Sequence, residues 1–302
     1  MTEERLASQA VAVSHDGRAE AWRTSRRIID LSKPVVMGVL NITPDSFSDG
    51  GRYFRREAAL RRLQELQAAG ADIIDIGGES TRPGSSAVEE DAEMQRVLPI
   101  VEAASARVDV AVSIDTTKAN VARAALNAGA EIINDISGLR FDPALAGLAA
   151  KSRAGLVLMH IRGRPRTMQT DIHYDDLLGE VAGELRASLE SALSAGCRRE
   201  QLVVDPGIGF GKTAAQNLVL INQLGALAEL GCPVLVGPSN KSFIGKTLGL
   251  AVGDRLEATL SACVIALLRG ARIFRVHDVR AARRALDMAE AIIRQESGAD
   301  AN

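Results

Sequence analysis

Eight short apolar runs in this chain each end in polar residues of the kinds that enzymes use for catalysis and ligand binding. A strand whose polar residues gather at its C-terminal end places them above a packed core. Eight such strands predict a (β/α)8 barrel, an α/β fold with its active site at the C-terminal face of the strands. In chain order, the polar endings are Asn41, Glu79 and Thr81, Asp115, Asn134 and Asp135, His160, Asp205, Lys241, and Arg275, His277 and Asp278.

Segments with the apolar spacing of helices separate these runs. We expect helices over residues 55–69, 89–106, 117–128, 143–150, 175–195, 214–230, 254–269 and 279–294. A doubly wound sheet is the competing architecture, but it would have fewer strands and one dominant glycine-rich loop. Because the polar endings are spread over all eight runs, the pattern favours the closed ring.

The length of 302 residues suits a single barrel, a fold that typically takes about 250 residues. Residues 1–27 are polar and weakly patterned, so we expect a loosely ordered N-terminal extension. The barrel is expected over residues 28–295, and residues 296–302 are expected to form a C-terminal tail.

Composition excludes several classes of protein. A net charge of -2 gives no electrostatic case for binding nucleic acid or an acidic membrane surface. No apolar run approaches the roughly 18 residues that a membrane helix needs, and the N-terminus lacks the apolar core of a signal peptide. The three cysteines show neither zinc-site spacing nor a disulfide framework. We therefore expect a soluble cytoplasmic protein.

The first two loops after predicted strands combine groups that can hold an anion. Residues 41–51 supply the amide of Asn41, carboxylates, hydroxyls and Phe47, and such a loop can bind a metal-associated anion and close over it. A merely flexible polar turn would not explain Phe47. In residues 77–84, glycines flank Thr81 and Arg82, and Arg82 can grip phosphate. The alternative for this second loop is that Glu79 pairs with an arginine in a tight turn.

Three strand endings carry hydrogen-bonding groups that suit a flat heterocycle. Asp115, Asn134 and Asp205 end three different strands. A carboxylate accepts two parallel N–H bonds from a guanidine-like ring edge, and an asparagine both donates and accepts. Asp115 could instead cap the helix that follows it. The recurrence of such groups at one depth favours the ligand role.

Cations follow the last two strands. Arg275 and His277 are two residues apart, so on a strand they face the same side and form a candidate diphosphate clamp, to which Lys241 adds a third positive group. His277 could instead be a supporting residue held by Asp278. A buried structural role for Arg275 is disfavoured because an unpaired interior guanidinium is costly. The glycine-rich loops after Pro206 and Asn240 lack the first glycine of a phosphate-binding loop, which removes the main support for ATP hydrolysis.

Motifs at every predicted βα loop together resemble the dihydropteroate synthase family, over roughly residues 27–295. The matching stretches are MGVLNITPDSFSDGG, GADIIDIGGESTRPGS, VSIDTTK, IINDISG, LMHIRGRPRTMQ, VVDPGIGFGKT, SNKSFIG and RVHDV. The resemblance implies condensation of 7,8-dihydropterin-6-ylmethyl diphosphate with 4-aminobenzoate in folate biosynthesis, with Mg²⁺. It also implies a homodimer, formed through late helices, that is a target of sulfonamides.

The same resemblance implies roles for individual residues. Asn41 would hold the Mg²⁺-diphosphate. Diphosphate oxygens would be bound by Thr81, Arg82, Arg275 and His277. The pterin pocket would be lined by Asp115, Asn134, Asp205 and Lys241, and the aminobenzoate site would be bordered by Phe47, Pro83, Phe210 and Ser242. Arg275, His277, Lys241 and Asp115 are the expected catalytic residues of a dissociative reaction without a covalent enzyme intermediate.

One position departs from the family pattern. The family usually has Ser-Arg-Lys after the seventh strand, whereas this chain has Ser239, Asn240 and Lys241. That change keeps a catalytically silent pterin-binding paralogue as an alternative, but the intact ESTRPG and DPGIGFGK loops favour activity. A methyltetrahydrofolate-binding methyltransferase domain is a second alternative, and it would not need Thr81, Arg82, Arg275 and His277 as a diphosphate clamp.

Overall fold

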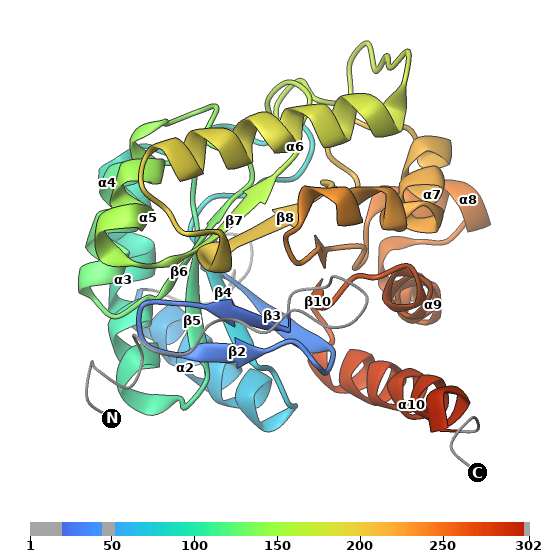
Figure 1. Ribbon diagram of the computed structural model, residues 1–302. Helices are drawn as coiled ribbons and strands as arrows, with labels where there is room; N and C mark the ends of the chain where they lie inside the picture. The colour runs from blue at the N-terminus through green and yellow to red at the C-terminus, as the bar shows by residue number, and fades with distance from the viewer. Residues whose placement is uncertain (1–19, 44–51, 299–302) are drawn as a thin grey trace.

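The computed structural model describes residues 20–43 and 52–298, and within them eight parallel strands form a ring. Neighbouring strands in the sheet follow the order β8, β7, β6, β5, β4, β3, β10, β9, and every pairing is parallel. The ring is completed between β8 and β9, where the Val204 amide donates to the Pro233 carbonyl at 3.0 Å. The predicted (β/α)8 barrel is therefore confirmed (Figure 1). The strands are β3 (Val35–Asn41), β4 (Ile73–Gly77), β5 (Ala111–Asp115), β6 (Ile132–Asp135), β7 (Gly155–Met159), β8 (Leu202–Asp205), β9 (Leu235–Val236) and β10 (Ile273–Val276).

Helices lie outside the ring and connect its strands (Figure 1). The predicted helix over residues 214–230 is wrong in part, because it divides at Gln223 into an α-helix and a 3-10 helix. The short helix α8 was not expected from the sequence. The α-helices are α2 (Arg52–Ala68), α3 (Glu90–Arg107), α4 (Ala119–Asn127), α5 (Ala144–Ser152), α6 (Leu177–Ser194), α7 (Ala214–Asn222), α8 (Ser242–Leu248), α9 (Leu256–Leu268) and α10 (Val279–Gly298). The 3-10 helices are η2 (Arg199–Gln201), η3 (Leu224–Leu230) and η4 (Val252–Asp254).

The lower half of the barrel interior, at the N-terminal ends of the strands, is apolar. One buried cluster joins inward-facing residues of all eight strands, among them Met37, Ile73, Ile132 and Ile273. A second cluster packs the outward-facing residues, such as Ile74 and Phe274, against the helices. Because side chains alternate along a strand, both faces of each strand are buried, which explains why the runs read as almost continuously apolar.

The segment just before the barrel is ordered, contrary to the prediction that residues 1–27 form a loose extension. Strands β1 (Ala21–Arg23) and β2 (Ile28–Asp30) form an antiparallel pair, visible in the foreground of Figure 1. Trp22 is fully buried in the lower interior cluster, and its indole N–H donates to the Gln201 carbonyl at 2.8 Å. This pair therefore closes the N-terminal end of the barrel. Residues 1–19 lie outside the described part of the chain.

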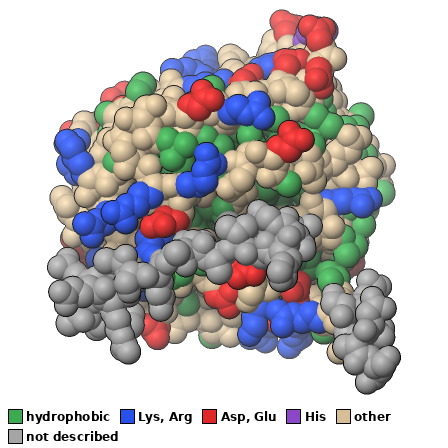
Figure 2. All heavy atoms as spheres, in the orientation of Figure 1, with side chains coloured by type: hydrophobic (Ala, Val, Ile, Leu, Met, Phe, Trp, Pro, Cys, Tyr) green, Lys and Arg blue, Asp and Glu red, His purple; other side chains and the backbone are tan. Residues whose placement is uncertain are grey.

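At the other end of the chain, α10 continues to Gly298, so the first residues of the predicted tail are helical. No helix within residues 20–43 and 52–298 is both long enough and apolar enough to cross a membrane. On the face shown in Figure 2, basic and acidic side chains are interspersed, in keeping with the small net charge.

The upper half of the interior is polar. Two residues closer to the C-terminal end of each strand, the next inward-facing positions include Asp75, Ser113, Asn134, Asp205 and Arg275. These residues belong to β4, β5, β6, β8 and β10, so polar side chains continue from the C-terminal face into the barrel interior. A charged layer above an apolar one has to be held by internal hydrogen bonds and ion pairs.

Candidate active site

Arg275 lies at the centre of this polar layer, between two carboxylates. Its Nε donates to Asp75 Oδ2 at 2.7 Å, and its Nη2 donates to Asp115 Oδ2 at 2.7 Å. The Arg275 side chain is 20% exposed, whereas Asp75 is completely buried. The prediction that Arg275 faces the barrel mouth holds, but the argument that it has no structural role is wrong, because it is paired with carboxylates from two other strands.

Burial and neighbouring charges together set the pKa values of Arg275 and Asp115. Burial alone would lower the pKa of Arg275, but Asp75 and Asp115 outweigh it and raise that pKa. Burial raises the pKa of Asp115 to about 7, an effect that Arg275 opposes and Asp75 strengthens. Two acids thus share one permanent cation, and the pKa of one of them, Asp115, lies close to neutral pH.

The residues expected to hold the heterocycle lie around the same opening. Asn134 donates from Nδ2 to Asp75 Oδ2 at 3.0 Å. Asp205 accepts the Gly207 amide at 2.7 Å, and burial raises its pKa although Lys241 opposes this. Lys241 donates to the Ile208 carbonyl. Carboxylate, amide and ammonium groups from three strand ends therefore converge at this opening.

An apolar wall stands beside these polar groups. Ile136, Met159, Ile161, Met168 and Phe210 form a separate buried cluster at the C-terminal end of the barrel. The Lys241 ammonium lies 4.5 Å from the centre of the Phe210 ring, a cation–π contact. A flat ligand can thus lie against apolar side chains while its edge meets the polar ones.

His277, which follows β10, is held by the loop that follows the neighbouring strand β9. Its Nδ1 lies 2.9 Å from Ser239 Oγ, and the same oxygen accepts the His277 amide at 3.2 Å. Ser239 Oγ therefore orients the imidazole through its Nδ1, and Nε2 is the ring nitrogen left for a ligand. Burial, together with Arg275, Lys241 and Arg82, lowers the pKa of His277 to about 4, so the ring is neutral at pH 7.

The alternative that Asp278 holds His277 is wrong, because Ser239 contacts the imidazole and Asp278 Oδ1 instead accepts the Ala281 amide at the start of α10. Asp115 is likewise no helix cap, since the first amide of α4, that of Ala119, donates to Asp142 at 2.7 Å.

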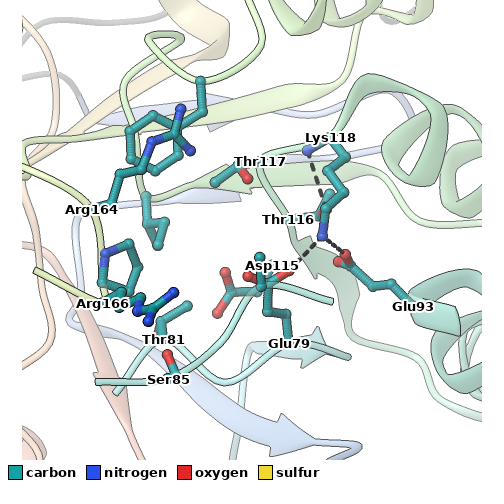
Figure 3. A pocket seen from close by; sticks show the side chains of 14 residues that line it. Glu79, Thr81, Ser85, Glu93, Asp115, Thr116, Thr117, Lys118, Arg164 and Arg166 are labelled. Carbon is teal, nitrogen blue, oxygen red and sulfur yellow. Dashed lines mark hydrogen bonds and ion pairs between the residues drawn. The ribbon is translucent and has the colours of Figure 1, made fainter. Parts of the chain in front are cut away.

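The loop between β4 and α3 is anchored by Lys118. The Lys118 ammonium forms ion pairs with Glu79 and with the buried Glu93 of α3. The alternative pairing of Glu79 with an arginine of its own turn is therefore wrong. Thr81, Asp115, Arg164 and Arg166 line a common pocket of about 240 Å³, and the two arginines, from the loop after β7, lie on the side opposite Lys118 and Glu93 (Figure 3). Gly84 donates to the Pro165 carbonyl at 3.1 Å, which joins the two loops.

Asn41 lies close to this group at the end of β3. It pairs in register with Gly77. A Cβ atom added at Gly77 would lie 3.6 Å from Asp115 Oδ2 and 3.7 Å from Asn41 Oδ1, so the glycine leaves room for both side chains. Pro83 and Ser242 are exposed, the latter at the start of α8. Phe47 lies outside the described residues.

Three important side chains were not expected from the sequence. Asp75 lies in the middle of an apolar run, and its only signal is a carboxylate at an inward-facing position. Lys118 reads as an ordinary residue at a helix start. Lys212 is buried and donates to the Gly207 and Phe210 carbonyls, while its Nζ lies 2.9 Å from His160 Nδ1. It therefore holds the glycine-rich loop that carries Phe210.

Comparison with known proteins agrees with this geometry. Residues 37–277 match the family described as pterin binding enzyme. A dihydropteroate synthase of Synechocystis sp. is 48% identical over 260 residues, which cover 86% of this chain and 90% of that protein.

Solved structures are similar as well. A Yersinia pestis dihydropteroate synthase in complex with a sulfonamide drug superposes with a TM-score of 0.85 at 43% identity, covering 90% of this chain and 98% of that one. A Xanthomonas albilineans dihydropteroate synthase in complex with 7,8-dihydropteroate superposes with a TM-score of 0.82 at 40% identity, with the same coverage.

Proposed function

This chain belongs to the dihydropteroate synthase family of pterin-binding enzymes, and from that premise we propose how its residues carry out the family's reaction. It is a transferase of folate biosynthesis, which condenses 7,8-dihydropterin-6-ylmethyl diphosphate with 4-aminobenzoate to give 7,8-dihydropteroate and diphosphate. The observation that carries the residue assignment is the contact of Arg275 with Asp115 in the barrel mouth, because it puts the candidate diphosphate clamp beside the candidate heterocycle pocket.

The pterin is bound by the polar half of the mouth. Asp115 and Asp205 accept N–H groups from the ring edge, and Asn134 and Lys241 contact its remaining polar atoms. The buried position of both carboxylates supports this role, since a buried carboxylate gains strongly from ligand N–H donors. The cluster around Met159 and Phe210 packs against the face of the ring.

The diphosphate is bound by Arg275, His277, Thr81 and Arg82. We propose that the neutral ring of His277 carries its proton on Nε2 and donates it in a hydrogen bond to a phosphate oxygen, while Ser239 donates to Nδ1. Arg82 lies near enough to His277 to help lower the pKa of that residue, which supports a common anion site for the two. As the C–O bond to the leaving group lengthens, these donors stabilise the negative charge that builds on the diphosphate.

The chain contributes no covalent nucleophile to this mechanism. The pterin methylene becomes cationic when diphosphate departs, while the nearby carboxylates of Asp115 and Asp205 stabilise that charge. The amino group of 4-aminobenzoate then attacks the methylene and loses a proton. Phe210, Pro83 and Ser242 border its site, and Phe47 is proposed to do so from outside the described residues. The bound sulfonamide in the Yersinia pestis relative supports the expectation that sulfonamides compete for this site.

Mg²⁺ fits this site only when diphosphate is bound. Among the described residues, no group of three or more His, Cys, Asp or Glu side chains could hold a metal by itself. Mg²⁺ prefers oxygen ligands and commonly takes most of them from substrate phosphates and water. We therefore assign the amide oxygen of Asn41 as its protein ligand. When bound, the ion neutralises charge on the leaving diphosphate.

A homodimer is the proposed assembly. Exposed apolar side chains occur on the late helices: Leu218 and Val219 on α7, Leu248 on α8, and Ile265 and Leu268 on α9. These helices are in contact with one another, so the side chains can contribute to one surface. Leu248→Glu is expected to shift the protein to monomers in sedimentation velocity, whereas Ala187→Glu on the exposed face of α6 leaves the dimer intact. A monomeric wild-type protein at micromolar concentration contradicts this assembly.

The activity is tested by measuring diphosphate release from the pterin diphosphate with Mg²⁺, with and without 4-aminobenzoate. We expect release that depends on 4-aminobenzoate, together with formation of 7,8-dihydropteroate. Tight pterin binding without any release would instead identify a silent paralogue. Binding of methyltetrahydrofolate in preference to the pterin diphosphate would identify a methyltransferase domain.

A further inference from the structure

Asp75 connects the two halves of the site through a single oxygen atom. Its Oδ2 accepts from Arg275 Nε at 2.7 Å and from Asn134 Nδ2 at 3.0 Å. In the proposed mechanism, Arg275 binds diphosphate and Asn134 binds the pterin. Asp75 itself has no exposed surface, so it acts only through these two neighbours.

We infer that Asp75 is a positioning residue that aligns the diphosphate clamp with the pterin pocket. This inference rests on the proposed function, because it assigns a purpose to the link between two substrate-binding residues. No direct contact of Asp75 with either substrate is needed.

The position of β4 in the ring explains why this one carboxylate reaches both partners. Strands β10, β3, β4, β5 and β6 are consecutive neighbours in the sheet, with β4 in the middle. Arg275 comes from β10 and Asn134 from β6, so each partner lies two strands away from Asp75. All three side chains face the barrel interior at about the same depth. A carboxylate that points inward from the middle strand can therefore contact side chains from the first and the last of these five strands.

Charge balance gives Asp75 a second effect. Arg275 is paired with both Asp75 and Asp115, and Asp115 is also proposed to bind the pterin. When ring N–H groups engage Asp115, Arg275 retains Asp75 as a full ionic partner. Without the Asp75 charge, Arg275 would depend on Asp115 alone and would compete with the pterin for it. Asp75 thus leaves Asp115 available to substrate.

Ser113 provides a matched control. It pairs in register with Asp75 on the neighbouring strand β5, and it is equally buried. Its hydroxyl has no hydrogen-bond partner within residues 20–43 and 52–298. Loss of the Ser113 hydroxyl therefore changes the same layer of the barrel without touching Arg275 or Asn134.

The experiment compares wild type, Asp75→Asn and Ser113→Ala. The measurements are the dissociation constants of a pterin lacking diphosphate and of inorganic diphosphate with Mg²⁺, together with kcat and the KM for the arylamine substrate. For Asp75→Asn we expect both dissociation constants to rise at least tenfold and kcat to fall at least tenfold, with the KM for the arylamine within about twofold of wild type. Ser113→Ala should stay within about twofold in every measurement.

Wild-type values of both dissociation constants in folded Asp75→Asn would overturn the inference, and so would an equal loss in Ser113→Ala. If Asp75→Asn does not fold, Asp75→Glu tests the inference in its place, because it keeps the charge but displaces the oxygen atom by one methylene group. Asp75→Glu must then weaken pterin and diphosphate binding while sparing the KM for the arylamine, and wild-type binding by this variant overturns the inference. Absence of turnover in the wild type would refute the proposed function instead, and the two dissociation constants would still decide the role of Asp75.

Discussion

Asn240 is the residue at which this chain departs from the family pattern, and its backbone has a conformation that suits asparagine. Its φ angle is +58°, in the left-handed region that asparagine tolerates better than most residues. The Asn240 carbonyl accepts from Arg255 Nη1 at 3.0 Å, and its amide donates to Thr259 at 3.2 Å. These contacts involve the backbone alone, so the exposed side chain can change without loss of the loop.

Asn240→Arg is therefore expected to keep or raise activity. The added cation lies one residue after Ser239, which holds His277, so it can only strengthen attraction for an anionic substrate. Left-handed strain should cost roughly 1 kcal/mol of unfolding free energy. Steady-state kinetics and thermal unfolding check both effects. A tenfold fall in kcat would mean that the Asn240 side chain has a role of its own.

At the scale of the elements, the loop between β8 and α7 depends on glycines in close contact with neighbouring backbone. Gly207 has a φ angle of +70°, and a Cβ atom there would lie 1.8 Å from the His160 carbonyl oxygen. Gly84 has a φ angle of +82°, but a Cβ atom there would meet nothing within 4 Å. A side chain at Gly84 would therefore add backbone strain alone, whereas one at Gly207 would add both strain and a steric clash.

We expect Gly84→Ala to lower the free energy of unfolding by roughly 1–2 kcal/mol, the usual cost of left-handed strain. Gly207→Ala should cost clearly more, because it also forces β7 and the loop apart, and pterin binding should weaken with it. Urea denaturation of both variants measures the difference. Equal losses would show that the loop can move away from His160.

His160 makes the connection between β7 and α6 sensitive to acid. Burial lowers its pKa to about 4, and its Nε2 lies 3.3 Å from Glu184. Between pH 6.5 and pH 4 the unfolded chain binds a proton that the folded His160 does not, so stability contributed by this residue is lost as pH falls through that window. The full effect is on the order of 3 kcal/mol.

The measurement is the Tm of wild type and His160→Gln between pH 7 and pH 5. The variant lacks the titrating ring, so the advantage in Tm that wild type has at pH 7 should shrink as the pH falls. Titrating groups that do not contact His160 contribute equally to both proteins and cancel in the difference, and Glu184, whose pKa His160 helps to lower to about 2, titrates below this range. A constant difference across this range would contradict a buried neutral imidazole at position 160.

For the whole molecule, the two ends of the barrel carry separate tasks. Trp22 fills the N-terminal end, and the site residues lie at the C-terminal end. Trp22→Ala should lower the unfolding free energy by about 3–5 kcal/mol, as expected for removal of a large buried side chain. Trp22→Phe, which keeps most of the volume, should lose less.

Activity per folded molecule should stay near the wild-type value in both Trp22 variants when it is measured at low temperature. Urea denaturation and kcat at about 15 °C make the comparison, since the folded state is close to its greatest stability there. A selective loss of kcat in well-folded protein would mean that the closed end of the barrel also controls the geometry of the site.

The sequence by itself determined the barrel, most of its helices and most residues of the candidate site. Parallel strands buried on both faces need continuous apolar runs, and their C-terminal ends need polar residues, so both patterns are readable along the chain. Five glycines that follow helices all have positive φ angles, as the usual helix-ending pattern predicts: Gly70, Gly129, Gly196, Gly231 and Gly270.

Only the tertiary structure decided which groups pair inside the ring. Asp75 lies within an apolar run and meets Arg275, 200 positions away, only because β4 and β10 flank β3. Lys118, Glu79 and Glu93 come together across two βα units, and Trp22 enters a core formed by all eight strands. Local patterns record which face of an element is buried. The partner of a buried charge depends on ring closure, which brings distant strands to the same depth.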